Sequence, residues 1–427
     1  MKAENAKKAP VPMRQAVIYK NEYADTLRRL TQENQNLEGL RYFLDLARRW
    51  ADEEQRARQK PEVVILSPDV PEELVIAAGA QPYWLLGGSL GSVAWSDDLV
   101  PRDTDPVSRS ILGYIHELNG VDFSDSLFIV PLISDSMRKI AYQLKDEGRK
   151  LCLVDFPPDR EDRRAMEQWQ DQMLAMTAAV AAHTKTRVTR RRVVKARKLA
   201  SIARRQLSSF LKLARDRENV LTAAARMLVQ NSYYYADDLR EWTERLAALT
   251  EELRSRASRV PPRYDRPGVL LMGSPVLFPN YKIPFLIREI GLDIVDVADA
   301  AALKLTGTDT KHILRGGRDR IIRAIAAERY THDASAAFVH NDALMRHVYR
   351  LLKRGGVEGV VYHVLKGQIE YDFELPRFEE LFAEYGIPVF RLETDYQYQD
   401  VEQLRIRMEA FSEMLTHNRW KGVKKAQ

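Results

Sequence analysis

One stretch of this chain decides the fold: Val64-Ile-Leu-Ser-Pro-Asp-Val-Pro-Glu-Glu-Leu-Val-Ile-Ala-Ala-Gly-Ala-Gln-Pro82. It opens with apolar and β-branched residues, which are typical of a buried strand. Pro71 and Glu73 then indicate the start of a helix, because a first helical turn tolerates proline and favours carboxylates. Gly79 indicates where that helix ends. A strand that runs directly into a helix is one unit of a parallel sheet with helical cover.

The same alternation of strand and helix continues in two regions of the chain. The expected strands are Val63–Leu66, Tyr83–Leu86, Ser126–Val130, Lys150–Asp155, Val269–Met272, Leu292–Val297, Gly359–Tyr362 and Val389–Leu392. The expected helices start at Pro71 and span Ser136–Asp146, Lys282–Ile290, Asp342–Arg354, Pro376–Tyr385 and Val401–Leu415. Residues 1–60 and 159–260 instead repeat apolar residues at helical spacing throughout.

We therefore predict an α/β protein with two doubly wound, Rossmann-like parallel-sheet lobes, a helical N-terminal segment and a helical middle subdomain. The expected boundaries are 1–60 for the N-terminal segment, 61–158 for the first lobe, 159–260 for the helical subdomain and 261–427 for the second lobe. Pro261 and Pro262 mark the linker into the second lobe.

The composition is that of an ordinary soluble globular protein, with 45% hydrophobic and 30% charged residues in 427. No apolar stretch approaches the length that crosses a bilayer, and the polar N-terminus lacks the apolar core of a secretory signal. We therefore expect a cytoplasmic protein that does not bind a membrane.

The net charge of +6 invites a nucleic-acid interpretation. The basic excess is concentrated in Lys185–Arg205, where apolar residues recur at helical spacing. We expect a solvated face of an amphipathic helix, with docking of a partner subunit as an alternative and nucleic acid as a weaker one, since no nucleic-acid motif accompanies the run.

The chain has one cysteine, Cys152, so it holds no internal disulfide framework. Its surroundings alternate as in a buried strand, which predicts a core thiol. No histidine or cysteine spacing typical of zinc ligands occurs, and we expect no metal bound by this chain. No phosphate-binding Gly-x-x-x-x-Gly-Lys-Ser/Thr segment occurs either.

Several segments appear in an order that resembles one known family. They are Pro71-x-Glu73-Leu74, Pro101-Arg-Asp-Thr-Asp-Pro106, Pro131-Leu-Ile-Ser-Asp-Ser-Met-Arg-Lys139, Gly386-Ile-Pro388, Glu393-x-Asp395-Tyr396 and Gln403-x-Arg405-x-Arg407-x-Glu409-Ala-Phe411. Together they resemble the 2-hydroxyacyl-CoA dehydratase and benzoyl-CoA reductase family over about Val64 to Leu415. The segments after Gly386 carry the most specific part of the resemblance.

The chain departs from the family where iron–sulfur ligands would stand. The resemblance places Asp105, Ser134 and Gln368 at the three positions that carry cysteine in the family. Iron in such clusters is held by thiolates, and these oxygen and nitrogen donors are poor replacements. The resemblance then implies that this chain's own thiolates bind no cofactor, and that a paralogous cysteine-bearing subunit holds a [4Fe–4S] cluster. It also implies an acyl-CoA substrate and a separate ATPase as electron activator.

Four residues are candidates for catalysis: Glu73, Asp105, Ser134 and His363. Each has a plainer alternative, which is helix capping for Glu73, an ordinary loop position for Asp105 and Ser134, and a hydrogen-bonded histidine at the end of a strand for His363. Candidate contacts to CoA phosphates are Lys282, Arg288, Arg315 and Arg318, since lysine and arginine bind phosphate oxygens well.

Three functions compete on this evidence. The chain could be a subunit of an acyl-CoA-processing complex, resembling the larger core subunit of benzoyl-CoA reductase and contributing cleft walls and interface. It could instead be a non-catalytic scaffold or assembly protein that keeps the fold. A third alternative is acid–base chemistry on acyl-CoA by Asp105, Ser134 and His363, although no nucleophile–base motif accompanies them.

Overall fold

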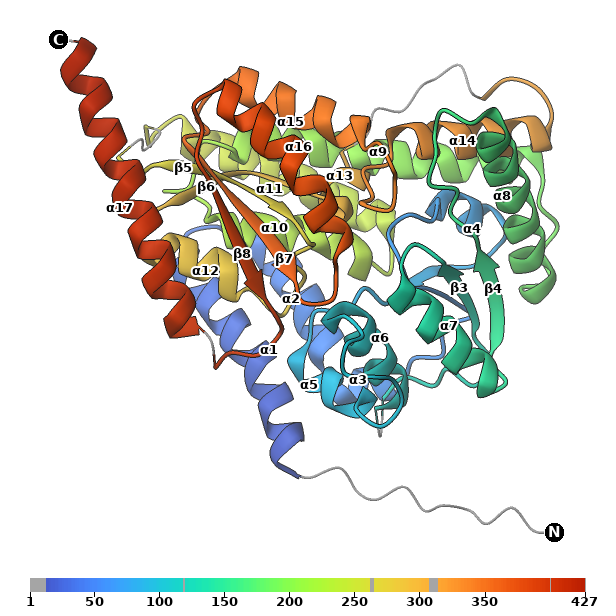
Figure 1. Cartoon of the computed structure of the whole chain (residues 1–427). Helices are drawn as coiled ribbons and strands as arrows, with labels where there is room; N and C mark the ends of the chain where they lie inside the picture. Colours follow the sequence, from blue (N-terminus) through green and yellow to red (C-terminus); the bar gives the residue numbers. More distant parts are fainter. Residues whose placement is uncertain (1–12, 118–119, 262–264, 307–313, 400, 427) are drawn as a thin grey trace.

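The computed structural model describes residues 13–117, 120–261, 265–306, 314–399 and 401–426, and it contains two four-stranded parallel sheets (Figure 1). The first sheet has the order β2-β1-β3-β4, built from β1 (Val63–Ile65), β2 (Pro82–Trp84), β3 (Leu127–Pro131) and β4 (Lys150–Val154). The second has the order β6-β5-β7-β8, built from β5 (Gly268–Gly273), β6 (Asp293–Asp299), β7 (Gly359–Leu365) and β8 (Val389–Thr394). The predicted α/β class with two parallel-sheet lobes is confirmed.

The two sheets share one topology. In each, the second strand lies outside the first, and the third crosses to the first strand's other side. Connections therefore diverge at β1 and β3 in the first lobe and at β5 and β7 in the second. Loops beyond the carboxyl ends of these strands are where ligands bind in open α/β sheets.

Helices cover both sheets and fill the space between them. Before β3 they are α1 (Met13–Glu33), α2 (Leu40–Ala51), α3 (Glu53–Ala57), α4 (Glu72–Ala77), α5 (Leu90–Val93) and α6 (Pro106–His116). Between β3 and β5 they are α7 (Asp135–Asp146), α8 (Arg163–His183), α9 (Arg190–Ala214), α10 (Ala223–Asn231) and α11 (Leu239–Ala257). After β5 they are α12 (Lys282–Glu289), α13 (Ala300–Lys304), α14 (Arg318–His332), α15 (Asp342–Arg354), α16 (Glu370–Glu384) and α17 (Val401–Ala426).

The pleat of the central strands divides the hydrophobic core. In β1, Val63 and Ile65 face the largest apolar cluster, whereas Val64 faces a separate cluster under α6 and α7. In β5, Leu271 belongs to the largest cluster and Leu270 to the one under α15 and α16. The largest cluster thus joins one face of each sheet to helices of the middle segment, so both lobes share one core.

Residues 159–260 form four α-helices and one short 3-10 helix (Ser232–Tyr235) rather than one uninterrupted helix. Thr189 and Thr222 begin α9 and α10 by accepting hydrogen bonds from Arg192 and Ala225 backbone N–H groups at 3.3 Å. Threonine at such a position satisfies a free N–H group of the first turn, so it marks a new helix start. Helix α9 packs against α4 of the first lobe and also against α11 and α14.

Two sequence expectations about strands need correction. Strand β7 runs to Leu365 and not to Tyr362, because His363 still pairs with Gly273 on one side and Leu392 on the other. Strand β4 is an edge strand, so Cys152 is half-buried rather than a core thiol. Burial nevertheless raises the pKa of the Cys152 thiol to about 11.

Helices α5, α6, α13 and α14 were not expected from the sequence. Helix α16 begins at Glu370 and not at Pro376, and α17 continues to Ala426 and not only to Leu415. Of the helices described in the structure, none is both long and apolar enough to span a membrane.

Candidate functional site

Asp105 lies at the start of α6, in the loop that leads into that helix. Its Oδ1 accepts hydrogen bonds from the backbone N–H groups of Val107 at 3.0 Å and Ser108 at 3.1 Å. The following Pro106 occupies the first helical turn, where its missing N–H group costs nothing. Asp105 is therefore a helix cap, and its side chain is 3% exposed.

Gln368, in the turn after β7, reaches Asp105 from the other lobe. Its Nε2 donates a hydrogen bond of 3.1 Å to Asp105 Oδ1. The preceding Gly367 has a φ of +85°, and a Cβ there would lie 2.9 Å from the carbonyl oxygen of Asp103. The turn can approach α6 this closely because Gly367 has no side chain.

Ser134 caps α7 and lies two residues before Ser136, which contacts Asp105. Its Oγ accepts a hydrogen bond from Met137 N–H at 3.2 Å, and the side chain is partly exposed. Two residues later, Ser136 Oγ accepts a hydrogen bond of 3.2 Å from the Asp105 backbone N–H. The first turn of α7, the turn after β7 and the loop before α6 therefore meet at Asp105.

A second carboxylate and two buried polar atoms lie close to Asp105. Burial raises the pKa of Glu370 to about 7, and the nearby Asp105 carboxylate adds to that rise. Gln368 Oε1 and Thr104 Oγ1 are buried and find no hydrogen-bond partner among the residues described.

These side chains do not fit an iron–sulfur cluster. The converging donors are one carboxylate, one amide and one hydroxyl, whereas cluster iron is held by thiolates. Asp105 and Gln368 are already hydrogen-bonded to each other, and Ser134 caps α7. In the described part of the chain, no group of three histidine, cysteine or carboxylate side chains is arranged to hold a metal ion.

His363 lies inside β7 and is 3% exposed. Its Nε2 is 2.8 Å from Thr394 Oγ1 and its Nδ1 is 3.1 Å from the carbonyl oxygen of Ser274. Burial lowers its pKa to about 4, so the ring is neutral near pH 7. The small cavity beside it, at the carboxyl ends of β5, β7 and β8, has a volume of about 10 Å³. The crevice at this point is filled by side chains.

Glu73 is fully buried in an ion-pair network rather than facing a cleft. It lies 2.6 Å from Arg197 and 2.9 Å from Arg329. Burial alone would raise the pKa of Glu73, but Arg329, Arg204 and Arg197 outweigh it and hold the pKa well below its usual range. The neighbouring Glu72 binds Arg204 at 2.6 Å. This network connects α4 to α9 and α14.

The same contacts correct the expectation of a solvated basic face at residues 185–205. Arg197 and Arg204 point inward and are 2% and 1% exposed, whereas Arg191, Lys198 and Arg205 are exposed as expected. The basic run therefore has two faces, one of which holds buried carboxylates.

The four expected phosphate contacts do not come together. Lys282 is buried and donates to the carbonyl oxygen of Gln397. Arg288 pairs with Glu218 at 2.7 Å. Arg318 pairs with its exposed neighbour Asp319, and Arg315 is exposed in the segment before α14.

Cationic side chains gather elsewhere, around a larger cavity that the sequence analysis missed. It is lined by Lys212 of α9 and by Arg346, Arg350 and Arg354 of α15. The signal was present in the four-residue spacing of the three arginines, which places them on one face of a helix. That these arginines lie across a cavity from α9 depends on tertiary packing, which the sequence pattern does not indicate.

Together these features define a class: a two-lobed α/β protein whose loops converge on one inter-lobe site without thiolates. The family described as 2-hydroxyglutaryl-CoA dehydratase, D-component, matches residues 69–415. The chain therefore belongs to this family.

Curated relatives carry similar names. The chain is 23% identical to the putative dehydratase subunit YjiM of Escherichia coli, over 81% of this chain and 89% of that protein. It is 22% identical to the (R)-phenyllactyl-CoA dehydratase beta subunit of Clostridium sporogenes, with the same coverage of both chains. It is also 22% identical to the (R)-2-hydroxyglutaryl-CoA dehydratase subunit beta of Acidaminococcus fermentans, over 84% of this chain and 94% of that one.

Proposed function

We propose that this chain is the cluster-free subunit of a 2-hydroxyacyl-CoA dehydratase-type complex, and that it works beside a cysteine-bearing partner subunit on an acyl-CoA. The relatives named above are subunits of dehydratases, which supports the reaction type. The earlier expectation of a benzoyl-CoA reductase subunit stays a prediction that these names do not test.

The contact between Asp105 and Gln368 carries the cluster-free part of the proposal. Two positions that the resemblance assigns to cluster cysteines are joined by a hydrogen bond of 3.1 Å, and Asp105 also caps α6. Such a site holds the two lobes together by polar contacts. We infer that iron–sulfur chemistry, where the complex uses it, belongs to the partner and its ATPase activator.

An exposed apolar patch beside this site supports the presence of a partner. It consists of Val339, Ile369 and Phe373, which are 64%, 63% and 78% exposed. Ile369 directly follows Gln368, and Phe373 lies one helical turn further along α16. Large apolar side chains gathered in one exposed place are typical of protein interfaces.

The test is anaerobic co-expression with a paralogue that carries the cysteine motifs, followed by purification through a tag on this chain. We expect a heteromer whose iron is lost when the paralogue's cysteines are changed to serine. The same preparation of this chain alone should contain no stoichiometric iron.

The triple variant Asp105→Cys, Ser134→Cys, Gln368→Cys sharpens the test, because it returns the thiolates that the resemblance assigns to these positions. We expect this variant to acquire iron when it is purified without the paralogue. A control with three cysteines at the exposed positions Arg163, Arg191 and Arg205 should acquire none. About four iron atoms per wild-type chain purified alone would contradict the proposal. An iron-free homomer that captures no paralogue would favour the scaffold alternative.

A further inference from the structure

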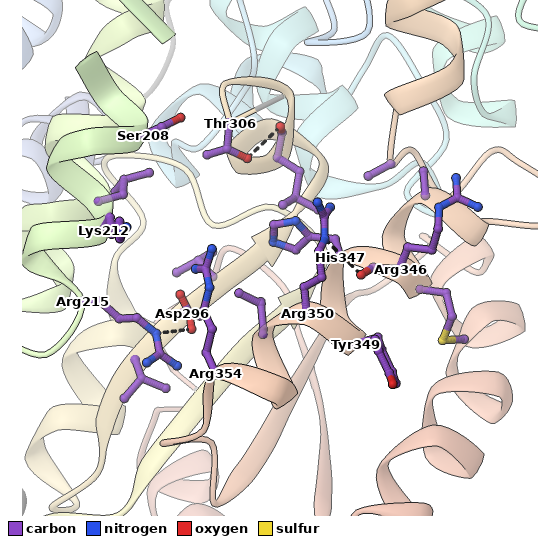
Figure 2. A pocket seen from close by; sticks show the side chains of 18 of the residues that line it. Ser208, Lys212, Arg215, Asp296, Thr306, Arg346, His347, Tyr349, Arg350 and Arg354 are labelled. Atoms are coloured by element: carbon purple, nitrogen blue, oxygen red, sulfur yellow. Dashed lines mark hydrogen bonds and ion pairs between the residues drawn. The ribbon is translucent and has the colours of Figure 1, made fainter. Parts of the chain in front are cut away.

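A large groove in the second lobe lies between helix α9, edge strand β6 and helix α15 (Figure 2). We call it the α9–α15 groove. Its volume is about 960 Å³, at the upper end of the range of roughly 300–1,000 Å³ that is usual for small-molecule sites. It is distinct from the loops that meet at Asp105, because its wall is the middle of β6, at Val295–Val297.

Most of the charged side chains that line the groove are cationic. Among its lining residues that the structure describes, Asp296 is the one carboxylate, and Arg215 Nε already binds it at 2.7 Å. Lys212, Arg350 and Arg354 also line the groove, and none of them forms an ion pair with a described residue, although Arg350 Nε donates a hydrogen bond of 3.3 Å to the Arg346 carbonyl oxygen. Figure 2 shows Lys212 and Arg215 on one side, with Arg350 and Arg354 facing them across the space.

The row of arginines on α15 is unfavourable for the helix itself. Arg346, Arg350 and Arg354 repeat at four-residue steps, and like charges at this spacing repel each other. Of the three, Arg354 stands in the last turn, where the helix dipole favours a cation, so the repulsion is offset only at that end of the row. An anion bound in the groove would attract the arginines and so offset the repulsion between them.

The floor of the groove adds an apolar component. It includes Leu211, Val295, Leu303 and Leu351, which give an organic group a surface to pack on. His347 lies among the arginines, and burial followed by the charges of Arg350 and Arg354 lowers its pKa to about 4. The imidazole is thus neutral near pH 7 and offers one donor and one acceptor to a ligand.

We propose that the α9–α15 groove binds an organic diphosphate through Lys212, Arg350 and Arg354. Two linked phosphates carry about two to three negative charges near neutral pH, which matches these three cations. Guanidinium groups bind phosphate oxygens with paired, charge-assisted hydrogen bonds. Adenine nucleotides and coenzyme A share this chemistry, and of the two only coenzyme A rests on the function proposed above.

The test is calorimetric titration of the full chain at low salt with inorganic pyrophosphate, ADP and coenzyme A. We expect ADP or coenzyme A to bind more tightly than pyrophosphate, because each adds an organic group over the apolar floor. The double variant Arg350→Gln, Arg354→Gln should weaken that binding by at least about tenfold. The conservative variant Arg350→Lys, Arg354→Lys should retain most of it.

The matched control is Arg191→Gln, Arg205→Gln, which removes the same charge from exposed positions of α9 outside the groove. Its affinity should stay within about twofold of wild type, since screened charges at a distance contribute little. Should the glutamine pair on α15 fail to fold, Lys212→Gln tests the opposite wall and should also weaken binding.

The arms of the titration separate the possible ligands. Tighter binding of coenzyme A than ADP would identify the cofactor as the source of the diphosphate, and the reverse order would identify a nucleotide. No binding of any probe, binding of pyrophosphate alone, or equal weakening in the α15 variant and the α9 control would overturn the proposal.

Discussion

Asp105 has a structural role that its hydrogen bonds define. Its carboxylate accepts two backbone N–H groups of α6 and the amide of Gln368. A thiolate at this position could bind iron, whereas the carboxylate satisfies a helix start and a neighbouring loop. The residue is part of the contact between the two lobes.

We expect Gln368→Ala to lower the free energy of unfolding by about 1 kcal/mol, because it removes one hydrogen bond between the lobes. Asp105→Ala should cost more, about 2 kcal/mol, since the α6 cap is lost as well. The double variant should lose less than the sum, because both single changes remove the same contact. Urea unfolding measures these values, and strict additivity would show that the two side chains do not interact.

At the residue scale, the sequence predicted the general location of site residues better than it predicted which side chains contact each other. Ser134 follows the expected strand Ser126–Val130, which indicated that it would lie near the carboxyl edge of the first sheet, whereas no expected element placed Asp105. The bond to Gln368 could not be predicted, because it depends on how the second lobe packs on the first. His363 was placed at a strand end because Lys366 and Gly367 look like loop residues, but the ladder with β5 and β8 continues past it.

Among the elements, helix α9 connects the lobes by charge. Its Arg197 binds Glu73 of α4 and Glu328 of α14, each at 2.6 Å, and its Arg204 binds Glu72. Buried ion pairs add little net stability, but the loss of one partner leaves an uncompensated charge. The network therefore makes the position of α9 specific, although apolar packing supplies most of the stability.

Glu73→Gln should lower the free energy of unfolding by about 3–5 kcal/mol, because Arg197, Arg204 and Arg329 lose the charge they surround. A matched control is Glu167→Gln, whose partner Arg163 is exposed at 92%. That change should cost less than about 0.5 kcal/mol. Equal effects in urea unfolding would mean that the buried network is no more important than a surface pair.

Helices α6 and α14 were missed from the sequence for different physical reasons. Helix α14 buries Ile321, Ile322 and Ile325, but Arg318–Arg320 and the arginines that follow give the segment a mixed pattern without a clean apolar stripe. Helix α6 has Pro106 at its start, which reads as a loop unless Asp105 is recognised as its cap. The strands, and helices α7, α12 and α15, were placed within about three residues at each end, whereas α16 begins at Glu370 instead of Pro376 and α17 continues to Ala426 beyond Leu415.

For the whole molecule, Glu22 connects α1 to both lobes and makes stability depend on pH. Its carboxylate accepts hydrogen bonds from Leu90 N–H at 3.0 Å and from Tyr398 OH at 3.1 Å. Burial raises its pKa from 4.5 to about 7, and the hydrogen bonds offset only part of that rise. The folded state therefore favours the protonated form.

The contribution of Glu22 is fully present below pH 4.5 and is lost as the pH rises towards 7. The shift corresponds to about 3 kcal/mol, since one pKa unit is about 1.4 kcal/mol. We expect the stability of Glu22→Gln relative to wild type to increase by about this amount between pH 4.5 and 7.5. Urea unfolding at both pH values measures the change, and a constant difference would contradict the raised pKa.

For the whole molecule, we also expect the exposed patch of Val339, Ile369 and Phe373 to determine whether the chain binds its proposed partner subunit. Aspartate at Ile369 and Phe373 places two charges in a surface that the proposed partner would cover, and removing a buried charge from water is costly. We expect Ile369→Asp, Phe373→Asp to reduce recovery of the cysteine-bearing paralogue in anaerobic co-purification by at least about tenfold, which corresponds to about 1.4 kcal/mol of binding free energy.

The control for assembly is Ile406→Asp, because Ile406 is 68% exposed on α17 but lies outside this patch. That variant should recover the paralogue normally, and both proteins should keep the unfolding profile of wild type. If the Ile406 variant lost the partner and the α16 variant kept it, the interface would lie along α17 instead. The Asp105–Gln368 contact would then face away from the partner, and the two halves of the complex could not share one site there.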